Sequence, residues 1–161
     1  MALTRAAHGS VGRVSTHQTP ADVTPPTHEI LPLVTLAVEH VFDTLTRQPV
    51  FEPTVLAVTH EGRQGMWTLP ELVPEQAAAA VADIQPMPER AVAVFDGEIQ
   101  TPQGPRPAVV VEAFDAAAVT STRLVFRYVP GIPGTDVTGR IEGEPILVAN
   151  GHNPLFGQVR D

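Results

Sequence analysis

The sequence has no cysteine, and its ten lysine-or-arginine positions are all arginines. Without cysteine, the chain forms no disulfide and has neither a thiolate nucleophile nor a sulfur ligand for zinc. Without lysine, it lacks the GxxxxGK[ST] phosphate loop. The arginines are scattered, which favours a compositional origin over a guanidinium site for carboxylates or phosphates, and the 17 prolines agree with such a bias. Because the absence of cysteine fits a reducing compartment, we expect a cytoplasmic protein.

Long apolar runs are also absent. No stretch reaches the roughly 18 apolar residues that a transmembrane helix requires. The N-terminus carries Arg5 and Arg13 but no continuous apolar segment, so we expect no secretory signal. The net charge of −8 argues against nucleic acid as a partner, because phosphate binding needs a concentrated basic surface. We therefore expect no membrane, no nucleic acid and no cofactor.

The chain length predicts one domain. A sequence of 161 residues with 43% apolar content can bury a single core. Residues 1–27 show no periodicity and end at Pro25-Pro26, which favours a flexible N-terminal arm. We assign residues 28–161 to one α+β domain, in which residues 150–161 form a tail.

Two segments show helical periodicity. The first begins at Thr27, a candidate N-cap, and ends before Pro49. Its apolar residues recur every three or four positions: Ile30, Val34, Ala37, Val41 and Leu45. The second helix covers residues 71–84, which are rich in alanine, and Pro86 and Pro88 follow it.

Five further segments have the composition of strands: 54–60, 65–69, 91–95, 108–114 and 122–129. Asp96-Gly97 gives a turn signal, residues 101–107 and 129–145 read as loops, and residues 146–149 are compatible with one more edge strand. The element order is α-β-β-α-β-β-β. We predict an α+β fold with a mainly antiparallel sheet of five to six strands and two helices on one face.

Candidate catalytic residues lie at the ends of these strands. His60, Asp96 and His152 are in positions where loops often carry binding groups, and together they would suit acid–base chemistry or a divalent ion. Turn chemistry alone also explains Asp96-Gly97, and it is the stronger explanation. No GxSxG motif accompanies them, so serine hydrolysis is not expected. If His60, Asp96 or His152 does bind a ligand, we expect the site to lie under the 129–145 loop.

A metal site has one weak candidate. His40 and Asp43 are one helical turn apart, a spacing that presents two ligands on one face. The apolar periodicity places both residues on the exposed side of the first helix, so an ordinary solvated pair is the stronger interpretation.

The strands supply the main functional hypothesis. Their second apolar face has no helix left to cover it in this scheme, so we expect a second subunit to do so. The expected interface combines apolar and charged side chains: Val110, Glu112, Arg123, Val125 and Arg127. Glu112 is also expected to form cross-strand ion pairs with the arginines. We therefore predict a non-catalytic domain that acts through association, most simply a homodimer; a ligand- or metal-binding domain or a hydrolase-type enzyme is the alternative.

Overall fold

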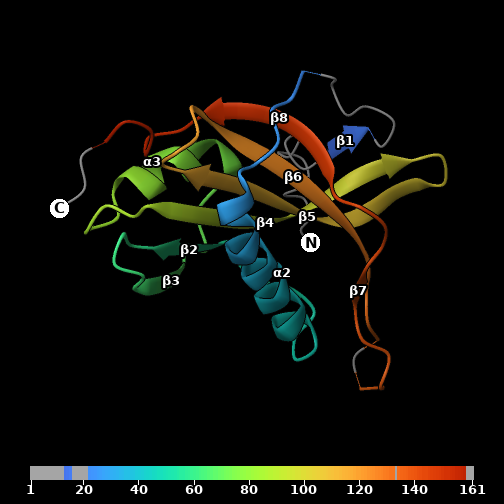
Figure 1. Ribbon diagram of the computed structural model, residues 1–161. Coiled ribbons are helices and arrows are strands. Elements are labelled where there is room, and N and C mark those ends of the chain that lie inside the picture. Colours follow the sequence, from blue (N-terminus) through green and yellow to red (C-terminus); the bar gives the residue numbers. More distant parts are fainter. Residues whose placement is uncertain (1–12, 16–21, 133, 159–161) are drawn as a thin grey trace.

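The computed structural model describes residues 13–15, 22–132 and 134–158 (Figure 1). Its elements in chain order are β1 (Arg13–Ser15), η2 (His28–Ile30), α2 (Leu31–Leu45), β2 (Thr54–Val58), β3 (Gln64–Thr68), η3 (Pro74–Gln76), α3 (Ala77–Ala82), β4 (Arg90–Thr101), β5 (Gly104–Asp115), β6 (Thr120–Val129), β7 (Arg140–Ile141) and β8 (Ile146–His152). These elements make one curled sheet with two short helices, so the predicted α+β class is confirmed. Within the described ranges, no helix combines the length and apolar content needed to span a membrane.

The sheet follows the order β3-β2-β4-β5-β6, and β6 then pairs with both β7 and β8. Every pairing is antiparallel except that of β1, which runs parallel to β4 beyond the end of β2. β4 and β5 form a long hairpin that extends past the rest of the sheet (Figure 1). The predicted, mainly antiparallel arrangement is therefore confirmed.

Helix α2 covers one face of the sheet. Pro32 lies in its first turn, where a missing N–H costs no intrahelical hydrogen bond. Its apolar stripe packs on alternate residues of the strands because side chains of a strand point to opposite faces in turn. This first core includes Ile30, Val34, Ala37, Val41, Val92, Val94, Val109, Val111 and Leu124.

Helix α3 lies on the opposite face, so the prediction of two helices on one face is wrong. The other strand positions form a second core with α3 and a C-terminal leucine: Ala77, Val81, Ala91, Ala93, Phe95, Val110, Phe114, Val125 and Leu155. The strands of the β4–β5 hairpin are apolar on both sides, and each side needs its own cover. The second helix is also shorter than predicted, because Pro74 begins a short 3-10 turn ahead of it.

Two local turn signals were overridden by strand pairing. Asp96-Gly97 lies within β4, paired with Val109 and Ala108, rather than in a turn. Most of the expected 101–107 loop likewise belongs to the hairpin, which turns at Pro102 and Gln103 between the paired residues Thr101 and Gly104. Gly104 has a φ of +104°, which glycine adopts without the steric cost of a side chain.

Residues 150–155 are packed against the domain, which corrects the assignment of this part of residues 150–161 as a tail. β8 continues to His152, and Leu155 is completely buried in the second core. The side chain of Asn153 holds this segment: its Nδ2 donates to the main-chain oxygens of Asp115 and Ala118, at 2.8 and 2.6 Å. Its Oδ1 accepts the Leu155 N–H at 3.0 Å. The two adjacent large apolar residues of this segment, Leu155 and Phe156, give no periodic signal in the sequence.

Two parts of the predicted arm contact the domain. Residues 13–15 form β1, and residues 22–27 run over the β6–β8 pair. Asn150 clamps the main chain of Thr24, accepting its N–H at 2.8 Å and donating to its oxygen at 2.9 Å. The flexibility of residues 1–27 as a whole stays a prediction, and residues 1–12 and 16–21 lie outside the described ranges.

Candidate functional site

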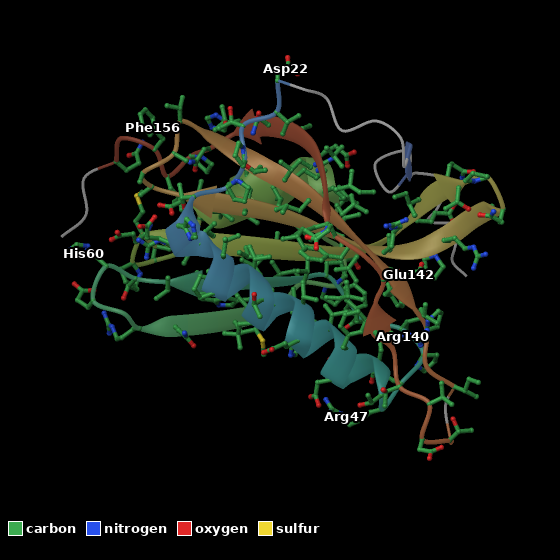
Figure 2. All side chains as sticks on the ribbon, turned by 45° about the vertical axis from the view of Figure 1, so that its right-hand side comes forward. Asp22, Arg47, His60, Arg140, Glu142 and Phe156 are labelled. Carbon is green, nitrogen blue, oxygen red and sulfur yellow. The ribbon has the colours of Figure 1, made fainter. Side chains whose placement is uncertain are left out.

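The three residues proposed for acid–base chemistry do not form one site. His60 follows β2, and His152 ends β8 beside Thr120, so both lie at the same end of the sheet. Asp96 lies six residues along β4 from Arg90, which corresponds to about 20 Å in a strand. Figure 2 shows His60 and Phe156 at one end of the molecule and Arg140 and Glu142 at the other.

Asp96 instead influences a tyrosine on the α2 face. Tyr128 packs edge-on against Phe42, with ring centroids 5.5 Å apart. Burial raises the pKa of Tyr128 to about 12, and the negative charge of Asp96 acts in the same direction. Tyr128 thus packs against the first core, and its burial favours the protonated phenol.

His60 belongs to a surface ion-pair chain. Its Nδ1 lies 2.6 Å from Glu89 Oε1, and Glu89 Oε2 lies 3.5 Å from Arg90 Nη2. The His60 side chain is 67% exposed, and exposed ion pairs contribute at most about 1 kcal/mol. This arrangement joins the start of β4 to the β2–β3 turn, and His60 lines neither the cleft near His152 nor the groove between α2 and β3.

The series of ion pairs continues from Arg90 to a buried carboxylate, that of Asp115. Asp115 is almost fully buried, and it accepts hydrogen bonds from Arg90 Nε at 3.2 Å, from the Ala117 N–H at 2.9 Å and from the Thr27 hydroxyl. A buried charge is tolerated when its lone pairs are satisfied in this way. Thr27 thus binds Asp115 instead of capping the first helix, and Asp115 has a structural role in anchoring the N-terminal segment.

The predicted cross-strand pair between Glu112 and Arg123 is present, with Arg123 Nε 2.8 Å from Glu112 Oε1. Ser121 Oγ donates to the other carboxylate oxygen at 2.5 Å. Glu112 is only 7% exposed, so the pair lies within the protein and not on a solvated face. Gly151 passes directly above, and a Cβ there would lie 3.0 Å from Ser121 Oγ.

The remaining interface candidates have two different environments. Val110 and Val125 are buried in the second core of a single chain, so they present no surface to a partner in this structure. Arg127 is partly exposed on the same face of the sheet, and its Nε is buried without a hydrogen-bond partner among the described residues. Strand periodicity places Val110, Val125 and Arg127 on one face of the sheet, but it does not show which other elements cover that face.

The candidate metal pair on α2 does not gather further ligands. Arg47 Nη1 binds Asp43 Oδ2 at 2.8 Å, and His40 borders a groove between α2 and β3. Among residues 13–15, 22–132 and 134–158, no group of three or more metal-ligating side chains occurs.

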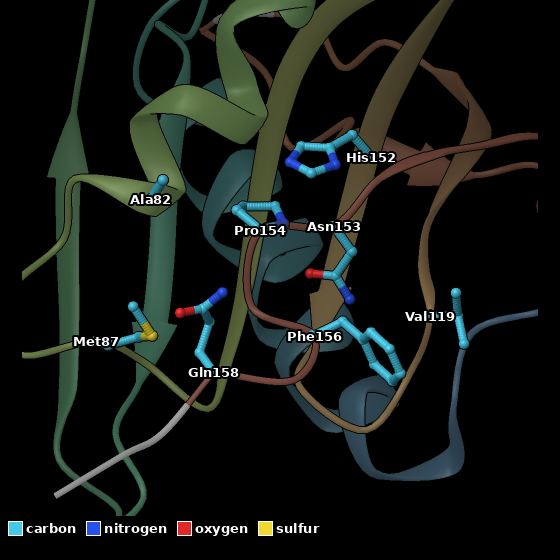
Figure 3. Close-up of a pocket in the computed structure, with 8 residues that line it drawn as sticks. All are labelled: Ala82, Met87, Val119, His152, Asn153, Pro154, Phe156 and Gln158. Atoms are coloured by element: carbon cyan, nitrogen blue, oxygen red, sulfur yellow. The ribbon is translucent and has the colours of Figure 1, made fainter.

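His152 borders an open cleft of about 520 Å³ between α3 and the C-terminal segment (Figure 3). Met87 lies on the α3 side, and Phe156 and Val119 lie on the other side. The cleft is mainly apolar, and Asn153, its central amide, is already engaged with main-chain groups. It lies away from the 129–145 loop, where the sequence had placed a ligand site.

The outer edge of β3 is a feature that the sequence did not single out. β3 is the last strand of the sheet order and contains no charged residue and no proline. Thr59 N–H bonds to Arg63 O and Leu69 N–H to Pro53 O, which fixes the alternation of the β2–β3 ladder. Gly65 therefore directs its main-chain groups toward β2.

The intervening residues of β3 direct their N–H and C=O groups outward: Gln64, Met66 and Thr68. No described residue pairs with these outward groups. Large apolar side chains flank the edge, with Met66 52% and Trp67 39% exposed. Met66 also borders the groove of about 300 Å³ that Leu36 and His40 line on α2.

The edge at β8 differs from that at β3. β8 carries a bulge, because Arg123 pairs with Ala149 while the next residue, Leu124, pairs with Leu147. Bulges and bound segments are ordinary means of protecting a sheet edge, and here Asn150 also binds Thr24. Among the described strands that end the sheet order, β3 has neither a bulge nor a charge.

Comparison with protein-family models, with curated protein sequences and with solved structures gives no match.

Proposed function

We propose that this domain is non-catalytic and acts by self-association through the outer edge of β3. The observation that carries the proposal is an uncharged, proline-free edge strand whose outward main-chain groups have no partner in the described part of the chain, together with two exposed large apolar residues, Met66 and Trp67. Natural sheet edges are usually blocked by charge, proline or bulges, and an unblocked edge is suited to strand addition. The surface differs from the one expected from the sequence, which included the buried Val110 and Val125.

The register of such a dimer follows from the outward groups. Antiparallel pairing that uses all of them places Met66 opposite the partner's Met66 on a two-fold axis, with Gln64 opposite the partner's Thr68. Gly65 then lies opposite the partner's Trp67. In this structure the Trp67 ring already covers Gly65 of its own strand, where a Cβ would lie 2.7 Å from the ring. The two indoles would therefore lie side by side across the interface.

Arg63 precedes β3 and Glu71 follows it, and both are exposed. In this register Arg63 lies opposite the partner's Leu69 and Glu71 lies opposite the partner's Glu61, so the charges at the strand ends do not add to the attraction. The strand is only five residues long, so the dimer belongs to the small, concentration-dependent class of interfaces, below about 1,200 Å².

Sedimentation velocity over about 10 μM to 1 mM tests the proposal. Trp67 is the only tryptophan, so its fluorescence reports burial of the same edge. We expect the sedimenting mass to rise with protein concentration and the Trp67 emission to shift to shorter wavelength at the same time. The Met66→Lys variant should show neither change. Gln64→Pro removes only an outward N–H and should have the same effect. Val119→Lys, at a 69% exposed apolar residue of the β5–β6 turn, is the matched control. A monomer at every concentration, or dimers unaffected by Met66→Lys, would refute the proposal.

The open cleft near His152 supports a second candidate function, binding of a small apolar ligand. Its volume of about 520 Å³ lies within the usual range of ligand sites, and Met87 and Phe156 supply apolar walls. A thermal-shift screen of apolar carboxylic acids and amines tests it, with Phe156→Ser as the variant that should lose the stabilisation. In either role we propose a cytoplasmic location.

A further inference from the structure

Three arginines of the sheet differ in how their charges are satisfied. Arg90 binds Asp115 and Arg123 binds Glu112, and both carboxylates are buried. Arg127 also extends from the sheet, two residues beyond Val125, but it has no ion pair within the described part of the chain. A guanidinium carries a permanent positive charge and five N–H donors. A guanidinium without an ion pair at the protein surface is therefore suited to binding an oxyanion.

The position of Arg127 is fixed by its neighbours. Its Nε is buried, and its Nη2 lies so close to Gly143 that a Cβ there would be 2.6 Å away. Gly143 has a φ of +78°, which allows the main chain to pass directly over the guanidinium. The Glu142 N–H donates to Arg127 O at 2.8 Å and pins this loop to β6. The guanidinium is thus held by packing before any ligand arrives.

Two further arginines share this face. Arg106 lies two residues before Ala108, the strand partner of Arg127, and Arg140 pairs with Val129, two residues after Arg127. Alternation along β5, β6 and β7 places Arg106, Arg127 and Arg140 on the same side of the sheet. Arg106 and Arg140 are exposed, and neither has an ion pair within the described ranges. Figure 2 shows Arg140 at the end of the molecule opposite His60.

This grouping is unusual for a chain with a net charge of −8. Glu142 lies opposite Arg127 in the register of β6 and β7, and Glu144 follows two residues later. Both are exposed, and neither forms an ion pair with Arg127 among the described residues. Three guanidiniums suit a ligand with two negative charges better than a single carboxylate, since each added charge gains from bidentate hydrogen bonds.

We infer that Arg127, with Arg106 and Arg140, forms a binding site for a phosphate-bearing small molecule. Arg127 supplies the fixed donor at the base, and the two exposed arginines close on the phosphate oxygens from β5 and β7. The site lies away from β3 and does not depend on self-association.

Calorimetric titration of the full chain with inorganic phosphate tests the site, at ionic strength matched with sodium chloride. We expect saturable binding, weakened about tenfold or more in Arg127→Gln, because a charge-assisted hydrogen-bond set is lost. Arg140→Gln, at an exposed position, should weaken binding without affecting the fold, and this variant keeps the test decisive if Arg127→Gln unfolds. Arg47→Gln, the same charge change at the end of α2, should leave binding unchanged.

Acetate provides the second arm of the experiment. Acetate binding as tight as phosphate binding would overturn the preference for a phosphate group. No phosphate binding above the chloride background, or equal binding by the Arg140→Gln and Arg47→Gln variants, would overturn the site itself.

Discussion

Truncation of Leu155 to alanine should destabilise the fold severely, although this residue lies only six positions before Asp161. Leu155 is completely buried in the second core. The change removes three carbon atoms, which at about 0.8 kcal/mol for each buried methylene corresponds to about 2.4 kcal/mol of transfer free energy. The cavity that remains raises the expected loss in the free energy of unfolding to about 3 kcal/mol, within the range of buried Leu→Ala changes.

Urea unfolding followed by circular dichroism measures this loss. With an m-value of about 2 kcal/mol/M, the midpoint of Leu155→Ala should fall by about 1.5 M while the slope stays constant. The measurement is made at low micromolar concentration, so that self-association does not contribute to stability.

Phe156→Ala provides the control at the next position. The Phe156 side chain is 45% exposed, so its truncation should lower the free energy of unfolding by less than about 1 kcal/mol. Equal, small effects of the two substitutions would mean that the C-terminal segment does not complete the second core, and the assignment of two covered sheet faces would be wrong.

Tyr128 is the only tyrosine, so absorbance at 295 nm follows its titration directly. Because burial raises its pKa from 10 to about 12, the contribution of Tyr128 to stability is complete below pH 10 and is lost as the pH rises toward 12. Tyr128→Phe should remove this decrease of stability with pH. A titration midpoint near 10 in the native protein would contradict the burial of Tyr128. Asn153→Ala should cost about 1–3 kcal/mol in urea unfolding, since two main-chain oxygens lose their donor, and a loss of a few tenths would show that water replaces it. Arg123→Met should lower the free energy of unfolding by about 3 kcal/mol, because it leaves the buried Glu112 carboxylate without its partner. Adding Glu112→Gln should recover part of this loss. If it recovers none, the loss comes from packing and not from the unpaired charge.

The sequence predicted most of the elements but not what covers them. Periodicity located α2 and the central strands because it reports which residues of an element share a face. It could not assign faces to layers: α3 and the strand residues Val110 and Val125 proved to lie together in the second core. The dimer face inferred from those valines was therefore already filled by the chain itself.

Local signals failed where long-range pairing was stronger. Asp96-Gly97 has the composition of a turn, yet each residue is paired across the β4–β5 hairpin. A turn preference is a local effect, whereas strand stability depends on the packing of side chains against neighbouring strands, so tertiary context decides. The Glu112–Arg123 pair was predictable because register brings alternate residues of neighbouring strands together, whereas the contact of Thr27 with Asp115 spans 88 residues and leaves no local signal.

The open edge of β3 could not be recognised from its residues either. Gln64, Met66 and Thr68 differ from their neighbours only in the direction of their main-chain groups, which depends on the pairing with β2. Arg127 likewise resembles Arg123 in the sequence. Only the structure shows that Arg123 has a buried partner, whereas the Nε of Arg127 has none within the described ranges.

Amide hydrogen exchange at low and high protein concentration tests self-association through β3 most directly. The amides of Gly65 and Trp67 bond to β2 and should be protected at both concentrations, whereas those of Gln64, Met66 and Thr68 point outward. Self-association through this edge predicts that the three outward amides exchange rapidly in the dilute sample and become protected in the concentrated one. Rapid exchange of these three amides at the higher concentration, in a sample that sediments as a dimer, would place the interface elsewhere and contradict the proposal.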